Sequence, residues 1–233
     1  LLAKKFASFL QNDLGLNKGD RIAIMMPNIL QYPVALFGAL RAGLVVVNVN
    51  PLYTARELEH QLNDSGAKAM VIFENSCKTL QGVIQNTSLK YVMTTQIGDF
   101  LKFPKSAIVN FVLKHVKKMV PDWDIPQARS FKECVFKADE SRFQPPEIGH
   151  EDTAFLQYTG GTTGVAKGAD LTHKNIISNM LQARAWIGDF VTPEENPIII
   201  TPLPLYHIFS LTANCFIFSY LGSLNVLIPN PRD

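Results

Sequence analysis

The sequence has little charge and little cysteine, and it contains no internal repeat or low-complexity tract. Charged residues make up 18% of its 233 residues and the formal net charge is +2, a balance too small to indicate a nucleic-acid partner. The cysteines, Cys77, Cys134 and Cys215, are widely spaced and form no C-x-x-C pair. We therefore expect buried, reduced thiols in a cytoplasmic protein rather than a disulfide framework.

Two common phosphate-binding motifs are absent as well. The sequence has no Walker A loop, in which Gly-Lys precedes Ser or Thr, and no G-x-G-x-x-G that opens a helix. His60, His115 and His150 lack the spacing of a zinc site. We therefore assign no metal ion to protein side chains.

One uncharged run, residues 208–228, is just long enough to span a membrane. Asn214 and Asn225 interrupt its apolar character, and Gly222-Ser223 divides it. We interpret it as a buried helix over 205–221 followed by a buried strand over 223–228. A membrane span is the alternative.

The remaining sequence is rich in apolar residues, which make up 47% of the chain and suffice for a core. Helical and strand patterns alternate: the expected strands are 20–26, 44–49, 69–73 and 91–94, and the expected helices are 2–12, 28–41, 54–66 and 131–137. Asn28 is expected to cap the second helix, and Thr54 with Glu57 fits a capping box. This alternation predicts an α/β fold with mostly parallel strands.

Prolines mark a connection between two parts of the chain. Pro121, Pro126, Pro145 and Pro146 fall among charged residues, a composition typical of a linker. We expect a first α/β subdomain over 1–120, a connection over 121–151, and the start of a second α/β subdomain over 152–233.

The most informative segment is Y-T-G-G-T-T-G-V-A-K-G, residues 158–168. Glycine lets backbone N–H groups approach a ligand closely, and hydroxyls with an ammonium bind phosphate oxygens. Because an apolar strand precedes the segment and a helix begins near Thr172, it is typical of a loop that binds a nucleotide polyphosphate. The alternative is a glycine-rich surface turn without a ligand.

This segment resembles the phosphate-binding signature of adenylate-forming enzymes, which include acyl-CoA synthetases, luciferases and peptide-synthetase adenylation domains. Many relatives carry Ser at the position of Gly160. The variant of the signature with Gly at this position resembles that of bacterial long-chain fatty-acid–CoA ligases. Three other segments support the resemblance in the expected order: M-P-N at 26–28, V-N-V-N-P-L-Y-T at 47–54 with R-E-L-E-H-Q-L at 56–62, and P-L-P-L-Y-H-I-F at 202–209. The resemblance therefore extends along almost the whole chain.

The resemblance implies a two-step ligase reaction that uses ATP, Mg²⁺, a long-chain fatty acid and coenzyme A. The acid first forms an acyl-adenylate with release of pyrophosphate, and the coenzyme A thiolate then displaces AMP. The loop can serve the first step through backbone N–H groups, hydroxyls and one ammonium. The residues concerned are Tyr158, Thr159, Gly160, Gly161, Thr162, Thr163, Gly164 and Lys167, of which Thr162 and Lys167 are the catalytic candidates. A solvated surface lysine is the alternative for Lys167.

Tyr206 and His207 belong to the motif that, in this family, lies beside the acyl pocket and the route of the second substrate. His207 is a third catalytic candidate, because a neutral imidazole can orient a carboxylate. It can equally hydrogen-bond a buried backbone carbonyl, and the sequence leaves the two roles open.

The resemblance also implies that the chain is the incomplete N-terminal large domain of such an enzyme. The acidic adenylation motif, the ribose-binding residues and the C-terminal lysine of the family cannot be located in it. We therefore expect these 233 residues to be inactive alone. A stand-alone nucleotide- or acyl-binding module, or part of a ligase for another carboxylic acid, is the alternative.

Two further features need a structural test. Residues 106–120 place apolar side chains every four residues beside Lys114, Lys117 and Lys118, a pattern typical of a helix at an anionic membrane or of an ordinary surface helix. A peripheral position on the inner face of the cell membrane is therefore an expectation. Asp170 stands where relatives carry an apolar residue, so it needs either a partner or an exposed strand.

Overall fold

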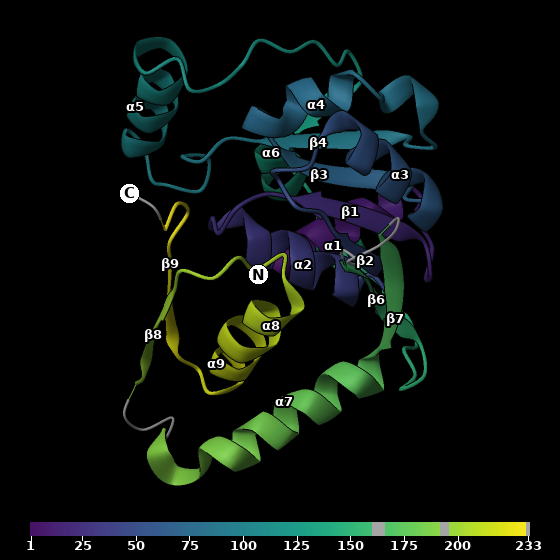
Figure 1. Ribbon diagram of the computed structural model, residues 1–233, viewed down its shortest axis with the longest axis vertical. Coiled ribbons are helices and arrows are strands. Elements are labelled where there is room, and N and C mark those ends of the chain that lie inside the picture. The colour runs from purple at the N-terminus through teal and green to yellow at the C-terminus, as the bar shows by residue number, and fades with distance from the viewer. Residues whose placement is uncertain (160–165, 192–195, 232–233) are drawn as a thin grey trace.

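The computed structural model describes residues 1–159, 166–191 and 196–231. Its main element is a seven-stranded sheet in the order β5-β4-β3-β1-β2-β6-β7 (Figure 1). The strands are β1 (Arg21–Met25), β2 (Val45–Asn48), β3 (Ala69–Phe73), β4 (Tyr91–Thr95), β5 (Ala128–Ser130), β6 (Thr153–Thr159) and β7 (Lys167–Thr172). The neighbours from β5 to β6 are parallel, and β7 is antiparallel to β6. The predicted α/β fold with a mostly parallel sheet is confirmed.

Helices connect these strands. They are α1 (Leu2–Asn12), α2 (Gln31–Arg41), α3 (Ala55–Ser65), α4 (Cys77–Gln81), α5 (Lys105–Phe111), α6 (Phe131–Phe136), α7 (His173–Ile187), α8 (Ile208–Ser210) and α9 (Ile217–Tyr220). Segments with π-helical hydrogen bonds, Val112–Val116 and Leu211–Phe216, continue α5 and α8. Single 3₁₀ turns occur at Glu74–Ser76, Ile84–Asn86, Glu140–Arg142 and Gly188–Phe190.

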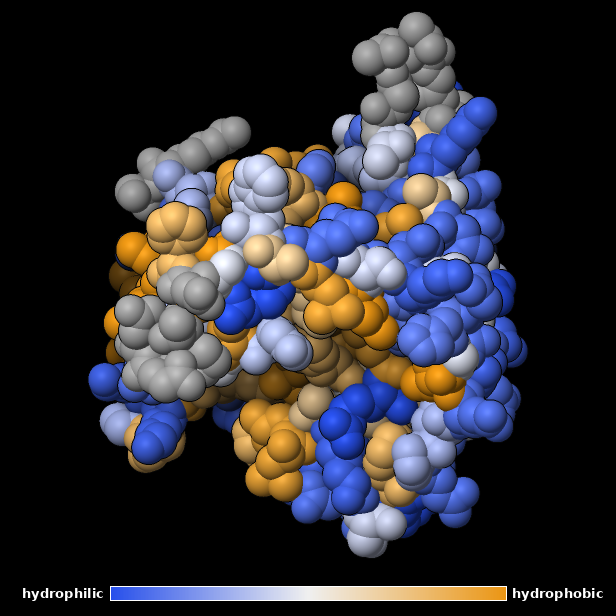
Figure 2. Space-filling view, turned by 90° about the horizontal axis from the view of Figure 1, so that it is seen from below, coloured by the Kyte–Doolittle hydropathy of each residue, from blue (hydrophilic) through white to orange (hydrophobic). Residues whose placement is uncertain are grey.

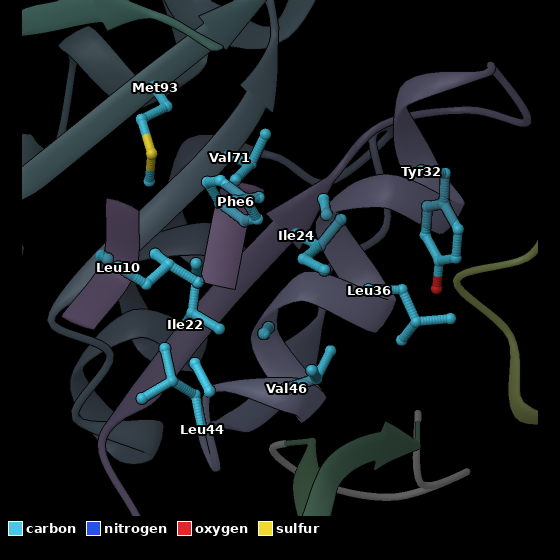
Figure 3. Close-up of a cluster of buried hydrophobic side chains, with 14 of the residues drawn as sticks. Phe6, Leu10, Ile22, Ile24, Tyr32, Leu36, Leu44, Val46, Val71 and Met93 are labelled. Carbon is cyan, nitrogen blue, oxygen red and sulfur yellow. The ribbon is translucent and has the colours of Figure 1, made fainter. Parts of the chain in front are cut away.

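The sheet buries apolar side chains on both faces, because successive residues of a strand point to opposite sides. Ile22 and Ile24 of β1 pack with α1 and α2, as Figure 3 shows. Ala23 and Met25, the alternate residues, lie in the second cluster with α3 and α4. Helices on both faces explain why the strands are apolar throughout rather than alternating.

Helix α3 follows its local sequence signals closely. The expected capping box is present at the start of α3, where the Thr54 hydroxyl accepts from Glu57 N and the Glu57 carboxylate accepts from Thr54 N. The same helix ends at Gly66, whose φ of 60° is left-handed, a conformation that glycine adopts without strain. These local bonds fix both ends of α3.

The second half departs from the prediction in two places. The helix expected over 106–120 ends at Val116, and Lys118 takes a left-handed φ of 49° just beyond it, a geometry that stops a helix. The strand expected over 223–228 forms as β9 (Leu224–Leu227), but it is not buried, since Leu224 is 62% exposed. Among the described residues, β9 pairs only with β8 (Ile198–Thr201) in a separate two-stranded sheet.

The helix expected over 205–221 is present as α8, its π-helical continuation and α9. No helix in the described ranges is long and apolar enough to cross a membrane. Figure 2 views the molecule from the side of α7 and shows patches of apolar surface there. Trp186 of α7 is 90% exposed.

The predicted division into 1–120, 121–151 and 152–233 stays a prediction. β6 and β7 lie beyond residue 152, yet β6 pairs with β2 and so continues the first sheet. The two-stranded sheet of β8 and β9 is the separate unit of β structure in the described second half.

Asn28 does not cap α2, contrary to expectation. The helix begins at Gln31, with Leu30 at the N-cap position and no side-chain cap bond. Asn28 is 3% exposed. Its Nδ2 donates to Thr201 O at 3.0 Å and to Leu203 O at 2.8 Å, and its Oδ1 accepts from Leu205 N at 2.8 Å. Backbone groups some 175 positions away thus bind the Asn28 side chain in place of the N–H groups at the start of α2. The amide thereby joins the end of β1 to residues 201–205.

We predict that Asn28→Ala destabilises the fold by about 2–4 kcal/mol, because it leaves two carbonyls and one N–H without this partner. Urea unfolding followed by circular dichroism measures the change. Asn75→Ala is the matched control, since it removes a single exposed bond to Met119 O and is expected to cost less than about 1 kcal/mol. Equal losses in the two variants would contradict the assignment.

Candidate functional site

Buried polar side chains connect the carboxyl ends of β2 and β6. Asn48 ends β2 and lies directly beside Gln157 of β6 in the parallel register. Asn48 Nδ2 donates to Gln157 Oε1 at 3.3 Å, and Gln157 Nε2 donates to Tyr206 O at 3.3 Å. Gln61 of α3 donates to Asn48 O at 2.8 Å. The chain of amides therefore links α3, two strands and the 202–209 motif.

Tyr32 of α2 joins the same network from the other side. Its hydroxyl oxygen lies 2.8 Å from both Asn48 Oδ1 and Leu205 O, so its single hydrogen serves one acceptor at a time. Figure 3 shows Tyr32 at the edge of the labelled apolar side chains. Complete burial raises the pKa of Tyr32 well above its ordinary value, so the group stays neutral. The buried polar side chains beneath the site, Tyr32, Asn48 and Gln157, are thus uncharged and held in place by hydrogen bonds.

Sequence reasoning missed Tyr32, Gln61 and Gln157 as site residues. The available signal was weak: Gln157 is a polar residue in an otherwise apolar strand, and Gln61 lies on the apolar side of α3. A polar residue inside an apolar pattern indicates a buried hydrogen bond, but it does not identify the partner.

Three of the four segments that carry the family resemblance meet at one pocket of about 290 Å³. Its lining residues include Pro27 and Asn28 after β1, Pro51 and Leu52 after β2, and Pro204 and Tyr206 after β8, and residues 228–231 after β9 complete the wall. Burial raises the pKa of Tyr206. The pocket is therefore lined by proline rings, an aliphatic side chain and neutral polar groups, which suits a ligand that is largely uncharged.

His207 lies beside this pocket motif but is exposed. It is the N-cap of α8, and its Nδ1 accepts from Phe209 N at 3.4 Å. Of the two roles left open by the sequence, bonding to a buried carbonyl is not observed among the residues that the structure describes. The structure shows a local cap instead, and a substrate-facing role for the imidazole stays a prediction.

The glycine-rich segment connects β6 and β7. The predicted phosphate ligands Gly160, Gly161, Thr162, Thr163 and Gly164 lie outside the described residues. The two flanks are described: Thr159 ends β6, and Lys167 opens β7 directly opposite it. Both side chains are exposed. Because directly opposed residues of an antiparallel pair project to the same face, a hydroxyl and an ammonium stand side by side there.

Tyr158 is buried, and its hydroxyl donates to Asp64 Oδ2 of α3 at 2.5 Å. Burial, together with this bond to a carboxylate, raises the pKa of Tyr158 well above the ordinary range. Its ring covers Gly168, where an added Cβ would lie 2.9 Å from the ring. The observed contacts of Tyr158 are therefore structural, and its predicted contact with a nucleotide stays a prediction.

Asp170, whose role the sequence left open, is exposed on β7 and accepts a hydrogen bond from Thr153 Oγ1 at 3.2 Å. The edge position of β7 in the sheet explains why a carboxylate is tolerated there. Both expected explanations thus hold, since the residue has a partner and also reaches water.

The cysteines are free and buried, as expected. Burial raises the pKa of Cys77 and Cys215 to about 12 and that of Cys134 to about 11, which leaves no nucleophilic thiolate at neutral pH. Within the described ranges, no group of three or more His, Cys, Asp or Glu side chains could hold a metal ion.

Comparisons with known protein families and sequences give matches over almost the whole chain. The model of the AMP-binding enzyme family matches residues 1–233. A long-chain-fatty-acid–CoA ligase of Salmonella typhimurium is 55% identical over 231 residues, which are 99% of this chain and 41% of that protein. The corresponding ligase of Bacillus subtilis is 37% identical over 235 residues, covering 97% of this chain and 40% of that protein.

Solved structures agree on the fold. The crystal structure of an anthranilate CoA ligase in complex with anthranoyl-AMP matches with a TM-score of 0.79 at 18% identity, over 98% of this chain and 39% of that one. A long-chain-fatty-acid-CoA ligase from Archaeoglobus fulgidus matches with a TM-score of 0.73 at 24% identity, over 98% and 38% respectively. The chain spans about two fifths of the length of the relatives that it matches. On the family match over its full length, this chain belongs to the AMP-binding enzyme family.

Proposed function

We propose that this chain is the N-terminal part of an ATP-dependent long-chain fatty-acid–CoA ligase. The observation that carries the proposal is the 55% identity over 99% of the chain to a protein of that name. The arrangement of the three motif segments around one pocket supports it. In the first half-reaction a carboxylate oxygen attacks the α-phosphorus of ATP, and the bond to pyrophosphate breaks. In the second, the thiolate of coenzyme A attacks the acyl carbon and AMP leaves.

The residues at the β6–β7 hairpin are assigned to the first half-reaction. An anion attacks a polyanion in that step, so donors and cations must offset the negative charge. Lys167 supplies an ammonium to the leaving pyrophosphate, and Thr159, Thr162 and Thr163 supply hydroxyl donors. The glycines at 160, 161 and 164 supply backbone N–H groups. Mg²⁺ is bound chiefly by the phosphates of ATP, because such sites usually combine few protein carboxylates with substrate oxygens.

The pocket lined by Pro51 and Tyr206 is assigned to the organic substrates. Its walls are mostly apolar, and its polar groups are neutral or already hydrogen-bonded. Such a lining accepts an alkyl or thioether-like chain without leaving a charge unpaired. His207 at the start of α8 is the candidate to orient the reacting carboxylate, since it is exposed and directly follows Tyr206, which lines the pocket.

We predict that Lys167→Ala and Thr162→Ala lower kcat/KM for ATP by about 10- to 100-fold in the full-length ligase, since each removes a charge-assisted or hydroxyl donor to phosphate. The assay is fatty-acid-dependent ATP–pyrophosphate exchange, paired with thermal melts. The melting temperature is expected to stay within about 2 °C of the wild type, because the proposed partners are ligand oxygens and not core groups.

Lys174→Ala is the matched control. Lys174 is a surface lysine of the next helix that pairs with Glu151 at 3.0 Å, and its removal is expected to leave exchange unchanged. Residues 1–233 expressed alone are expected to show no exchange above background. Normal turnover in both loop variants, or activity lost together with the fold, would reject the assigned roles. Exchange driven by a different acid but not by long-chain fatty acids would replace the proposed substrate.

We also propose that the full-length ligase docks on anionic membranes through α5, its continuation to Val116 and the residues that follow as far as Met119. The support comes from exposure: in the helix itself only Ser106 is buried, and Figure 1 shows α5 set apart from the sheet on long connections. Apolar side chains of this segment are open to solvent, with Ile108 57%, Phe111 60%, Val116 65% and Met119 55% exposed. These four side chains, which we call the apolar stripe, are therefore accessible to a lipid surface or another partner.

Charge selects the membrane as the partner of this stripe. Residues 101–120 contain five lysines and no acidic residue. The lysines are Lys102, Lys105, Lys114, Lys117 and Lys118. Exposed apolar side chains with a lysine rim complement a bilayer surface of anionic lipid, where each basic residue contributes about 1 kcal/mol. A long-chain fatty acid partitions into the same phase, so docking on the inner face of the cell membrane brings the enzyme to its substrate.

We predict that changing Lys114, Lys117 and Lys118 to Glu lowers partition onto anionic vesicles at least about tenfold, and that added salt weakens wild-type binding. Cosedimentation with anionic and neutral vesicles measures both effects. A second variant, Phe111→Ser with Ile108→Ser, tests the apolar contribution. Lys4, Lys90 and Lys132 changed to Glu form the charge-matched control and are expected to leave binding near the wild-type level. If the folded α5 variants bind as well as the wild type, the segment is an ordinary surface helix.

A further inference from the structure

Helix α3 contacts both strands of the hairpin that carries Thr159 and Lys167. On the β6 side, the Tyr158 hydroxyl donates to Asp64 Oδ2 at 2.5 Å. On the β7 side, His60 Nε2 lies 3.0 Å from Ala166 O, the residue before Lys167. His60 and Asp64 are four positions apart on α3, so both project from the same face of one helix. We call these two hydrogen bonds the α3 contacts.

Helix α3 is firmly fixed, so it can act as a reference for the hairpin. Leu58 and Leu62 are fully buried in the core. Gln61 lies between the two contact residues and bonds to the carboxyl end of β2 at Asn48 O. A capping box and a left-handed glycine close the two ends of the helix. A displacement of His60 or Asp64 would therefore require movement of the sheet itself.

The hairpin transmits these contacts to its exposed pair of residues. Thr159 is directly opposite Lys167, and Tyr158 is directly opposite Gly168. The Tyr158 ring lies so close to Gly168 that no Cβ fits there without movement. One strand is thus fixed by Asp64 through Tyr158, and the other by His60 through Ala166. Thr159 directly follows Tyr158, and Lys167 directly follows Ala166, so each exposed residue is next to one that is hydrogen-bonded to α3.

We propose that His60 and Asp64 are positioning residues that set where Thr159 and Lys167 stand relative to the bound polyphosphate. The assignment rests on the proposed function, in which those two side chains contact phosphate. Neither His60 nor Asp64 touches a substrate in this assignment. His60 donates its Nε2 hydrogen to a backbone carbonyl, and Asp64 accepts from a neutral tyrosine. Their removal should therefore affect the use of ATP and not the binding of the fatty acid.

The test compares His60→Ala and Asp64→Ala with His60→Gln and Asp64→Asn in the full-length ligase. The alanine variants are expected to raise the KM for ATP about 3- to 10-fold and to leave the KM for the fatty acid within about twofold, the effect of one lost hydrogen bond. The Gln and Asn variants retain a donor and an acceptor and should restore most of the loss. Asn63→Ala is the control on the same helix: it removes a bond to Asn86 O, away from the hairpin.

Hydrogen exchange at the amides of residues 166–168 gives a readout that does not depend on activity. Exchange should be faster in both alanine variants than in wild type and Asn63→Ala. Unchanged exchange together with a normal KM for ATP would overturn the proposal, as would equal increases in the KM of both substrates. If the wild type shows no fatty-acid-dependent activity, the ligase assignment fails. Amide hydrogen exchange in the variants then still shows whether the α3 contacts position the hairpin.

Discussion

Amide side chains buried at the carboxyl ends of parallel strands need hydrogen-bond partners other than water, and this requirement organises the whole candidate site. Asn48 ends β2 and is only 3% exposed, so its amide cannot reach solvent and bonds instead to Gln157 and Tyr32. Gln157 in turn requires an acceptor and finds it at Tyr206 O. An unpaired amide at any of these points would cost about 1–3 kcal/mol, so the segment after β8 is placed by the strands beneath it.

Parallel topology explains why motifs so far apart in the sequence converge. Crossover helices return each strand in the same direction, so the ends of β1, β2 and β6 all lie at one edge of the sheet. Loops at this edge commonly carry the ligand sites of α/β proteins. Pro27 follows β1, Pro51 follows β2, and Thr159 ends β6. The pocket and the hairpin therefore share an edge, which the proposed reaction of ATP with an organic acid would require.

Elements governed by local physics could be predicted from the sequence, and those governed by distant partners could not. The capping box of α3 depends on residues three positions apart, and it is present as expected. Asn28 is an equally good local cap, but three partners beyond residue 200 engage its amide completely. Tyr158 shows the same limit, since its acceptor is Asp64, 94 positions earlier. Motif matching indicated which segments matter, whereas the bonds that assemble them became visible only in three dimensions.

Exposed apolar surface supports a functional inference only where chemistry identifies what covers it. The outer residues of β8 and β9 are as exposed as those of α5, with Ile198 at 66% and Leu224 at 62%. However, residues 196–206 and 222–231 contain no charged side chain, so nothing in that sheet selects one partner over another. In residues 101–120, by contrast, five lysines and no acidic residue accompany the exposed apolar side chains. They add a second constraint, because a partner must be apolar and anionic together. A bilayer of anionic lipid satisfies both conditions at once, and the difference in charge separates the two surfaces.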